Sequence, residues 1–148
     1  MKYILALVIV LIATLFFFNK TSTPKNTVTI NNHVFTVEIA VSDEERVKGL
    51  SGRNELLENH GMLFVFNKPN VYTFWMKDTL IPLDMIFINN DQIVTIHKNV
   101  QPQPNATDEE LQRYSPKEPV NYVLEISGGL SEKYGFKEGD TVRADFGN

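Results

Sequence analysis

Residues 61–87, GMLFVFNKPNVYTFWMKDTLIPLDMIF, combine aromatic bulk with charged groups. The stretch holds the only tryptophan, Trp75, together with three of the four methionines and four of the ten phenylalanines. Its charged side chains are Lys68, Lys77, Asp78 and Asp84. A strand of a water-soluble domain does not ordinarily combine so many aromatic and charged side chains. Both kinds of side chain are typical where the edge of a hydrophobic core opens onto a pocket. We therefore expect the protein to act here.

Two acids and one ring offer chemistry. Asp84 and Glu125 could form an acid/base pair of the glycosidase kind, which requires carboxyl groups about 5–9.5 Å apart across a cleft. Trp75 could be a stacking platform for a sugar or another flat ligand. The alternative for Trp75 is a structural ring that is largely enclosed in the core.

Two arginines extend the candidate site. The planar guanidinium groups of Arg46 and Arg53 match carboxylates in shape. They could pair with acids and fix a helix against a sheet, or they could help to recognise a ligand; the sequence leaves both open. The full set of predicted ligand-binding residues is Arg46, Arg53, Trp75, Lys77, Asp78, Thr79, Asp84 and Glu125.

Neither a metal site nor a nucleophile is predicted. The histidines, His33, His60 and His97, are far apart and follow no ligand spacing. The chain has no cysteine, and Ser51-Gly52 is not a nucleophile elbow. We therefore predict no catalytic residues, no bound metal and no cofactor.

The first twenty residues differ from the rest. Tyr3 to Phe18 is a run of sixteen residues without charge, which is shorter than the ~20 apolar residues of a typical spanning helix. No Ala-x-Ala cleavage site follows the run, so an uncleaved anchor is favoured over a removed signal peptide. We predict a membrane anchor or signal segment at 1–20, a linker at 21–27 and a single globular β domain at 28–148.

The charge balance bears on partners. Beyond residue 20 the chain has 12 basic and 18 acidic side chains, and such an acidic domain is poorly suited to nucleic acid, because phosphate binding relies on Lys and Arg. The predicted partners are the membrane, through the N-terminal segment, and a small molecule or glycan, but no nucleic acid. The few residues before the apolar run are expected to stay in the cytoplasm, which places the globular domain outside the cytoplasm, in the cell envelope. If the N-terminal segment is cleaved, the domain is expected to be secreted.

The elements that would position the site are mostly strands. Val28 to Ile30 and His33 to Val41 predict a hairpin across Asn31-Asn32, and Met85–Asn89 with Gln92–His97 predicts another. Other strands are expected at Met62–Phe66, Val71–Met76, Val120–Ile126 and Thr141–Phe146. A turn at Pro69-Asn70 is predicted to separate the first two of these strands.

One helix start and one long connection complete the pattern. Ser42 followed by Glu45 is a capping box, with Gly49 and Gly52 limiting the helix that follows. Val100 to Lys117 is predicted to be a long surface excursion. The sum is an all-β fold, mainly an antiparallel sandwich or barrel, with one short helix and an N-terminal transmembrane segment.

Six ordered blocks resemble a known family. They are Glu45-Arg46 with Gly49-Leu50 and Arg53, GMLFVF, Phe74-Trp75-Met76-Lys77 with Thr79, Ile81-Pro82-Leu83-Asp84 with Phe87, Tyr122-Val123-Leu124-Glu125, and Gly139-Asp140. Over Val28 to Phe146 the chain resembles the family catalogued as domain of unknown function 192. The resemblance implies a β-rich fold of jelly-roll type, often behind a signal or anchor, and it supplies no activity. The chain departs from the family at Ser51 and Asp78, where methionine and asparagine are frequent.

Three functions remain open from the sequence. We favour a membrane-anchored extracytoplasmic binding or accessory domain that recognises a small ligand, a glycan or a partner segment. The alternatives are a carboxylate-dependent hydrolase of envelope polymers, using Asp84 and Glu125, and a structural envelope protein. Whether the protein is an enzyme is left open, with binding preferred.

Overall fold

The computed structural model describes residues 26–147. The predicted anchor at 1–20, and the predicted linker up to residue 25, lie outside the described residues. Within residues 26–147, no helix has both the length and the apolar composition that a membrane crossing requires.

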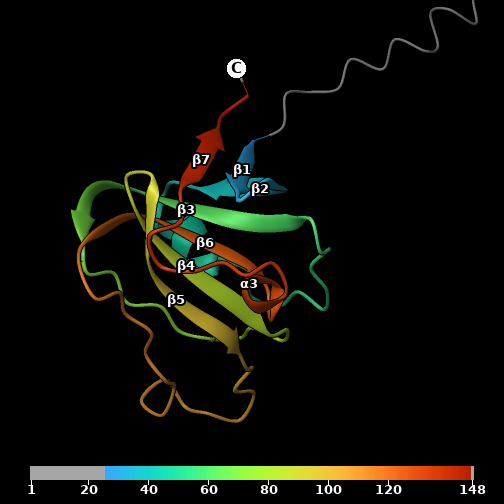
Figure 1. The fold of residues 1–148 in the computed structure, drawn as a ribbon. Coiled ribbons are helices and arrows are strands. Elements are labelled where there is room, and N and C mark those ends of the chain that lie inside the picture. Colours follow the sequence, from blue (N-terminus) through green and yellow to red (C-terminus); the bar gives the residue numbers. More distant parts are fainter. Residues whose placement is uncertain (1–25, 148) are drawn as a thin grey trace, which may run out of the picture.

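Seven strands form one sheet, which confirms the all-β prediction. They are β1 (Thr27–Ile30), β2 (His33–Ala40), β3 (His60–Asn70), β4 (Leu83–Asn89), β5 (Gln92–Val100), β6 (Val120–Ser127) and β7 (Val142–Asp145). Their order across the sheet is β5-β4-β6-β3-β2-β1-β7. All neighbouring pairs are antiparallel except β2 and β3, which are parallel. The sheet curls (Figure 1) into a half-barrel, and a single bridge between Gln92 and Thr141 joins its two edges.

Two short helices accompany the sheet. Helix α2 (Asp43–Lys48) begins at the predicted capping box, in which the Ser42 hydroxyl accepts a hydrogen bond from the backbone N–H of Glu45 and the Glu45 carboxylate accepts one from the N–H of Ser42. Helix α3 (Leu130–Lys133) was not predicted from the sequence. It is one turn long, which is too short for a periodic pattern to be recognisable.

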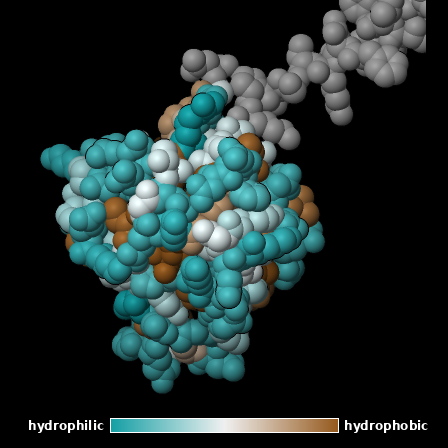
Figure 2. Space-filling model, in the orientation of Figure 1, coloured by the Kyte–Doolittle hydropathy of each residue, from teal (hydrophilic) through white to brown (hydrophobic). Residues whose placement is uncertain are grey.

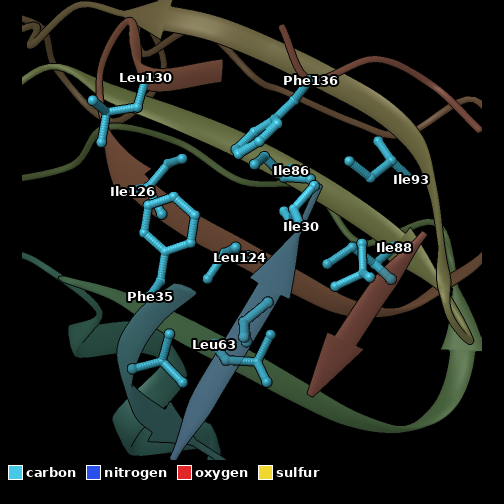
Figure 3. Packing of buried hydrophobic residues seen from close by; sticks show 13 residues of the cluster. Ile30, Phe35, Leu63, Ile86, Ile88, Ile93, Leu124, Ile126, Leu130 and Phe136 are labelled. Carbon is cyan, nitrogen blue, oxygen red and sulfur yellow. The ribbon is translucent and has the colours of Figure 1, made fainter. Parts of the chain in front are cut away.

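Apolar side chains gather on both faces of the sheet. The concave interior holds one core, in which Phe35, Leu63, Ile86, Leu124 and Phe136 pack together (Figure 3). The outer face carries a second core, whose members include Phe64, Met76, Leu83, Met85, Phe87 and Val123. The face of the molecule in Figure 2 is mostly hydrophilic, since these two cores take up most of the large apolar side chains.

The outer core explains two errors of the sequence-based prediction. No strand forms over 71–76: only Phe74 makes a bridge, with Tyr114. The predicted turn at Pro69-Asn70 is instead the end of β3. The segment 71–82 crosses the outer face, where Met76 and Ile81 are buried. Its apolar side chains thus cover the sheet and do not form part of it. The segment 101–119 has no helix or strand, in agreement with the long surface excursion predicted for Val100 to Lys117. It adds to the cover of the outer face through Tyr114.

Candidate functional site

A cavity of about 860 Å³ opens on the outer face of the sheet. Its walls come from α2 and the turn that follows, from β3, from the segment 72–79, and from single residues of the irregular segment and β6. The lining residues are Asp43, Arg46, Val47, Lys48, Gly49, Leu50, Phe64, Phe66, Asn67, Lys68, Tyr72, Thr73, Phe74, Trp75, Lys77, Thr79, Arg113 and Glu125. Exposed side chains such as Lys48 and Lys68 stand at its mouth, whereas Leu50 and Glu125 form its buried end.

Interlocking aromatic rings make up much of the wall. Phe66 stacks on Tyr72 with ring centroids 3.6 Å apart. Phe74 meets Phe64 edge to face at 5.0 Å, and Phe87 at 5.6 Å. Such contacts add to area burial and restrict ring motion. The wall is therefore pre-formed.

Trp75 stands half-buried in this wall beneath two cations. The Arg113 guanidinium carbon lies 4.0 Å from the centroid of the indole, and the Lys77 ammonium lies 5.5 Å from it. Arg113 donates a hydrogen bond to the backbone carbonyl of Asp108 (2.9 Å), and Lys77 forms an ion pair with the Asp108 carboxylate (2.5 Å). These contacts attach the irregular segment to the cavity wall and place positive charge over the ring.

Glu125 is the polar group at the buried end. It lies on β6 between Met62 of β3 and Met85 of β4, and it is 4% exposed. No hydrogen bond to its carboxyl group is found within residues 26–147. Burial raises the pKa of Glu125 from its ordinary value to about 8, because a charged carboxylate is poorly solvated there. At neutral pH this side chain is therefore mainly a neutral carboxylic acid, able to donate one hydrogen bond and to accept others.

Arg46 fixes α2 beside the cavity. Its guanidinium donates to the backbone carbonyls of Val41 and Val65 and to the Asp43 carboxylate, and its guanidinium carbon lies 5.1 Å from the centroid of the Phe66 ring. The arginine joins the start of the helix to β3. Its charge is shared with Asp43, so its main role is to shape the cavity.

Five of the eight predicted site residues line this cavity: Arg46, Trp75, Lys77, Thr79 and Glu125. Arg53 does not, because both of its terminal nitrogens donate to the Glu38 carboxylate at 2.6 and 2.7 Å. Asp78 does not either. Its exposed side chain lies on a turn, with a φ of 52° that asparagine and aspartate tolerate.

Asp84 also lies away from the cavity. Its carboxylate accepts hydrogen bonds from the backbone N–H groups of Asn99 (2.6 Å), Gly129 (2.8 Å) and Ser131 (2.5 Å). In the register of β4 and β6, Asp84 is opposite Ile126 and Met85 is opposite Glu125. Successive residues of a strand point to opposite faces, so Asp84 and Glu125 lie on opposite faces of the sheet. They do not share a cleft, and the two-carboxylate geometry of a glycosidase is not formed.

Several lining residues were absent from the sequence-based set. Phe66, Lys68 and Tyr72 lie within the aromatic stretch 61–87 that the sequence analysis singled out. Membership of that stretch could therefore have predicted that they line the site. Lys48 and Arg113 had none. Arg113 reaches the cavity from a segment without regular structure, and no local pattern predicts that contact. Within residues 26–147, no group of three His, Asp or Glu residues could hold a metal ion.

The chain is similar to a known family and to solved structures. Residues 26–144 match the family DUF192, which is described as "Uncharacterized ACR". No curated protein matches. A crystal structure of a protein of unknown function from Novosphingobium aromaticivorans is similar, with 39% identity, a TM-score of 0.71, and coverage of 80% of this chain and 83% of that one. Another, from Sinorhizobium meliloti, is named as a proposed transcription regulator; it has 35% identity, a TM-score of 0.71, and coverage of 82% of this chain and 92% of that one.

Proposed function

The chain belongs to the DUF192 family, and we propose that its β domain is a binding module that holds a small ligand in the cavity between Trp75 and Glu125. The observation that carries the proposal is this pre-formed, aromatic-walled cavity of about 860 Å³ with the buried carboxyl group of Glu125 at its end. Ligand sites commonly have volumes of about 300–1,000 Å³ and mostly apolar walls with a few polar groups.

Binding is a better proposal than hydrolysis. A hydrolase of envelope polymers would need a second carboxylate near Glu125, and Asp84 is on the other face of the sheet. Among the lining residues, the other acid is Asp43, which is exposed and paired with Arg46. A purely structural role does not account for an open cavity with aromatic walls.

The charge of the domain does not favour regulation of transcription, although one structural relative carries that name. Of the 14 basic side chains, 11 lie in residues 26–148, against all 18 acidic ones. A domain with this balance is expected to be repelled by the phosphates of nucleic acid.

The location and the finer fold type are also proposals. The uncharged run at Tyr3–Phe18 supports a membrane anchor that holds the domain outside the cytoplasm. Cell fractionation with protease treatment of intact cells tests this, since an outside domain is digested and a cytoplasmic one is protected. The curling of one sheet until its edges touch supports a barrel-like arrangement, whereas the jelly-roll type that the family resemblance implies would divide the strands between two sheets.

A thermal-shift screen tests the binding proposal. The full-length protein is screened against small metabolites and glycans, both neutral and charged. Ligands that bind the folded state raise the melting temperature. Because Trp75 is the only tryptophan, its fluorescence should change with each true ligand.

Trp75→Ala should remove the shift, whereas Phe146→Ala is the matched control, because Phe146 is an exposed aromatic residue away from the cavity. Hits that Trp75→Ala leaves unchanged, or the absence of any hit, would contradict the proposal.

A further inference from the structure

Positive charge is concentrated at this cavity in a domain that is acidic as a whole. Residues 26–148 contain 11 basic side chains, and five of them line the cavity: Arg46, Lys48, Lys68, Lys77 and Arg113. The lining acids are only two, Asp43 and the buried Glu125. The remainder of the domain must then carry a large excess of negative charge, so the cavity mouth is the place to which an anion would be drawn.

Acids neutralise only part of this charge. Arg46 is paired with Asp43, and Lys77 with Asp108. Lys48, Lys68 and Arg113 make no ion pair within residues 26–147. Arg113 is held over Trp75 by a bond to a backbone carbonyl, which leaves its charge unpaired and its position fixed. Such a cation needs little reorganisation to meet an anion.

The buried end has the opposite character. Leu50 and Phe64 are almost fully enclosed there, beside Glu125. Because burial raises the pKa of Glu125 to about 8, this side chain does not repel an anion at neutral pH, and its acid hydrogen can be donated to an oxygen or nitrogen of a ligand. The cavity thus offers a cationic mouth, an aromatic middle and a neutral hydrogen-bonding end.

We propose that the ligand is a small amphipathic anion, with a flat ring system between the aromatic walls and a carboxylate or phosphate at the Lys48–Lys68–Arg113 mouth. This inference rests on the proposed binding function and narrows its ligand class from small molecules in general to anions with a planar apolar body. A sugar acid without an apolar ring is the neighbouring class that the experiment separates from it.

The test uses matched probes on the full-length protein. Isothermal titration calorimetry at low salt compares 2-naphthoate with 2-naphthamide, which has the same ring and no charge, and with galacturonate, which has the charge and no aromatic ring. Because an exposed charge pair adds only modestly to affinity, 2-naphthoate should bind about fivefold more tightly than 2-naphthamide. Raising the salt from about 20 mM to about 500 mM should remove this preference, because the mouth is solvent-exposed.

Variants locate the effect. Lys48→Gln combined with Lys68→Gln should weaken 2-naphthoate binding about threefold, since Arg113 remains, and should leave 2-naphthamide binding unchanged. Lys98→Gln removes an exposed charge outside the cavity and is the matched control, with no expected effect.

Equal binding of 2-naphthoate and 2-naphthamide would overturn the anion inference and leave the binding function standing. Galacturonate binding more tightly than 2-naphthoate would overturn the ring requirement. Failure of 2-naphthoate to bind, while the thermal-shift screen gives other ligands whose shift Trp75→Ala removes, would overturn the inference and leave the binding function standing. The binding function itself is overturned only by the outcomes of that screen.

Discussion

Two buried acids in this domain show how surroundings decide a side chain's role. Asp84 is fully buried and accepts hydrogen bonds from three backbone N–H groups, so its role is structural: it joins β4 to the backbone of Asn99, Gly129 and Ser131. Glu125 is almost as buried, and no donor for it is found within the described residues. The two acids looked equivalent in the sequence, because hydrogen-bond donors supplied by distant backbone leave no trace near the residue that they serve.

Glu125 should make stability depend on pH. The pKa of an unfolded glutamate is near its ordinary value of 4.5, and the folded value is about 8. Between these values the folded protein binds one more proton than the unfolded one, so rising pH lowers the free energy of unfolding by on the order of 1 kcal/mol per pH unit. Glu125→Gln cannot ionise and should lack this loss.

Urea unfolding at intervals between about pH 5 and about pH 8 measures the effect. The exposed Glu118→Gln should keep the wild-type slope. An unaltered slope in Glu125→Gln would show that Glu125 is ionised in the folded protein at neutral pH.

Asp84→Asn should be costly. The amide keeps the size of the carboxylate but loses its charge and one acceptor oxygen, which leaves at least one buried N–H without a partner. We expect the free energy of unfolding to fall by about 2–3 kcal/mol. Asp78→Asn is the control, with an expected change within about 0.5 kcal/mol, because Asp78 is exposed and asparagine tolerates its positive φ. Similar losses in both variants would contradict the structural role of Asp84.

Strand β3 connects the two cores and the cavity wall. It pairs with β2 in parallel and with β6 in antiparallel fashion, and its residues contribute to both cores and to the cavity wall. Close approach to β6 is required at Gly61, where an added Cβ would lie 2.6 Å from the backbone oxygen of Glu125. This glycine therefore sets how closely β3 can approach the strand that carries the buried acid.

Gly61→Ala should separate these strands. Relief of the clash requires a backbone shift, and we expect the free energy of unfolding to fall by about 2–3 kcal/mol. Gly52→Ala is the comparison: its φ is +73°, but no atom lies within 4 Å of an added Cβ. The expected loss there is about 1 kcal/mol from backbone strain alone. Chemical denaturation of both variants measures the difference, and a smaller loss for Gly61→Ala would refute the close-packing argument.

Local signals predicted elements well where a turn or a cap fixed them. The hairpin at Asn31-Asn32 formed with both asparagines at positive φ, and the capping box placed the start of α2. The segment 71–76 was misassigned as a strand because an apolar segment that covers a sheet has the same composition as a strand within it. The parallel pairing of β2 with β3 follows from the topology of the whole chain, which local alternation does not encode.

At the scale of the molecule, one sheet separates two cores and only the outer one opens to solvent. The interior of the half-barrel is filled by side chains such as Phe35 and Phe136. The outer core is covered by segments of irregular structure, and its cover leaves the cavity beside Trp75. The sequence identified the aromatic stretch, Trp75 and Glu125, but the basic mouth was assembled from Lys48, Lys68 and Arg113, which are far apart in the chain. Its charge became visible only in three dimensions.

A crystal structure of the protein grown with 2-naphthoate tests the central claim most directly. We predict the naphthalene ring in the cavity against Trp75 and its carboxylate at the mouth, within reach of Lys48, Lys68 or Arg113. A ligand bound elsewhere, with the cavity holding only water, would contradict the assignment of this cavity as the binding site.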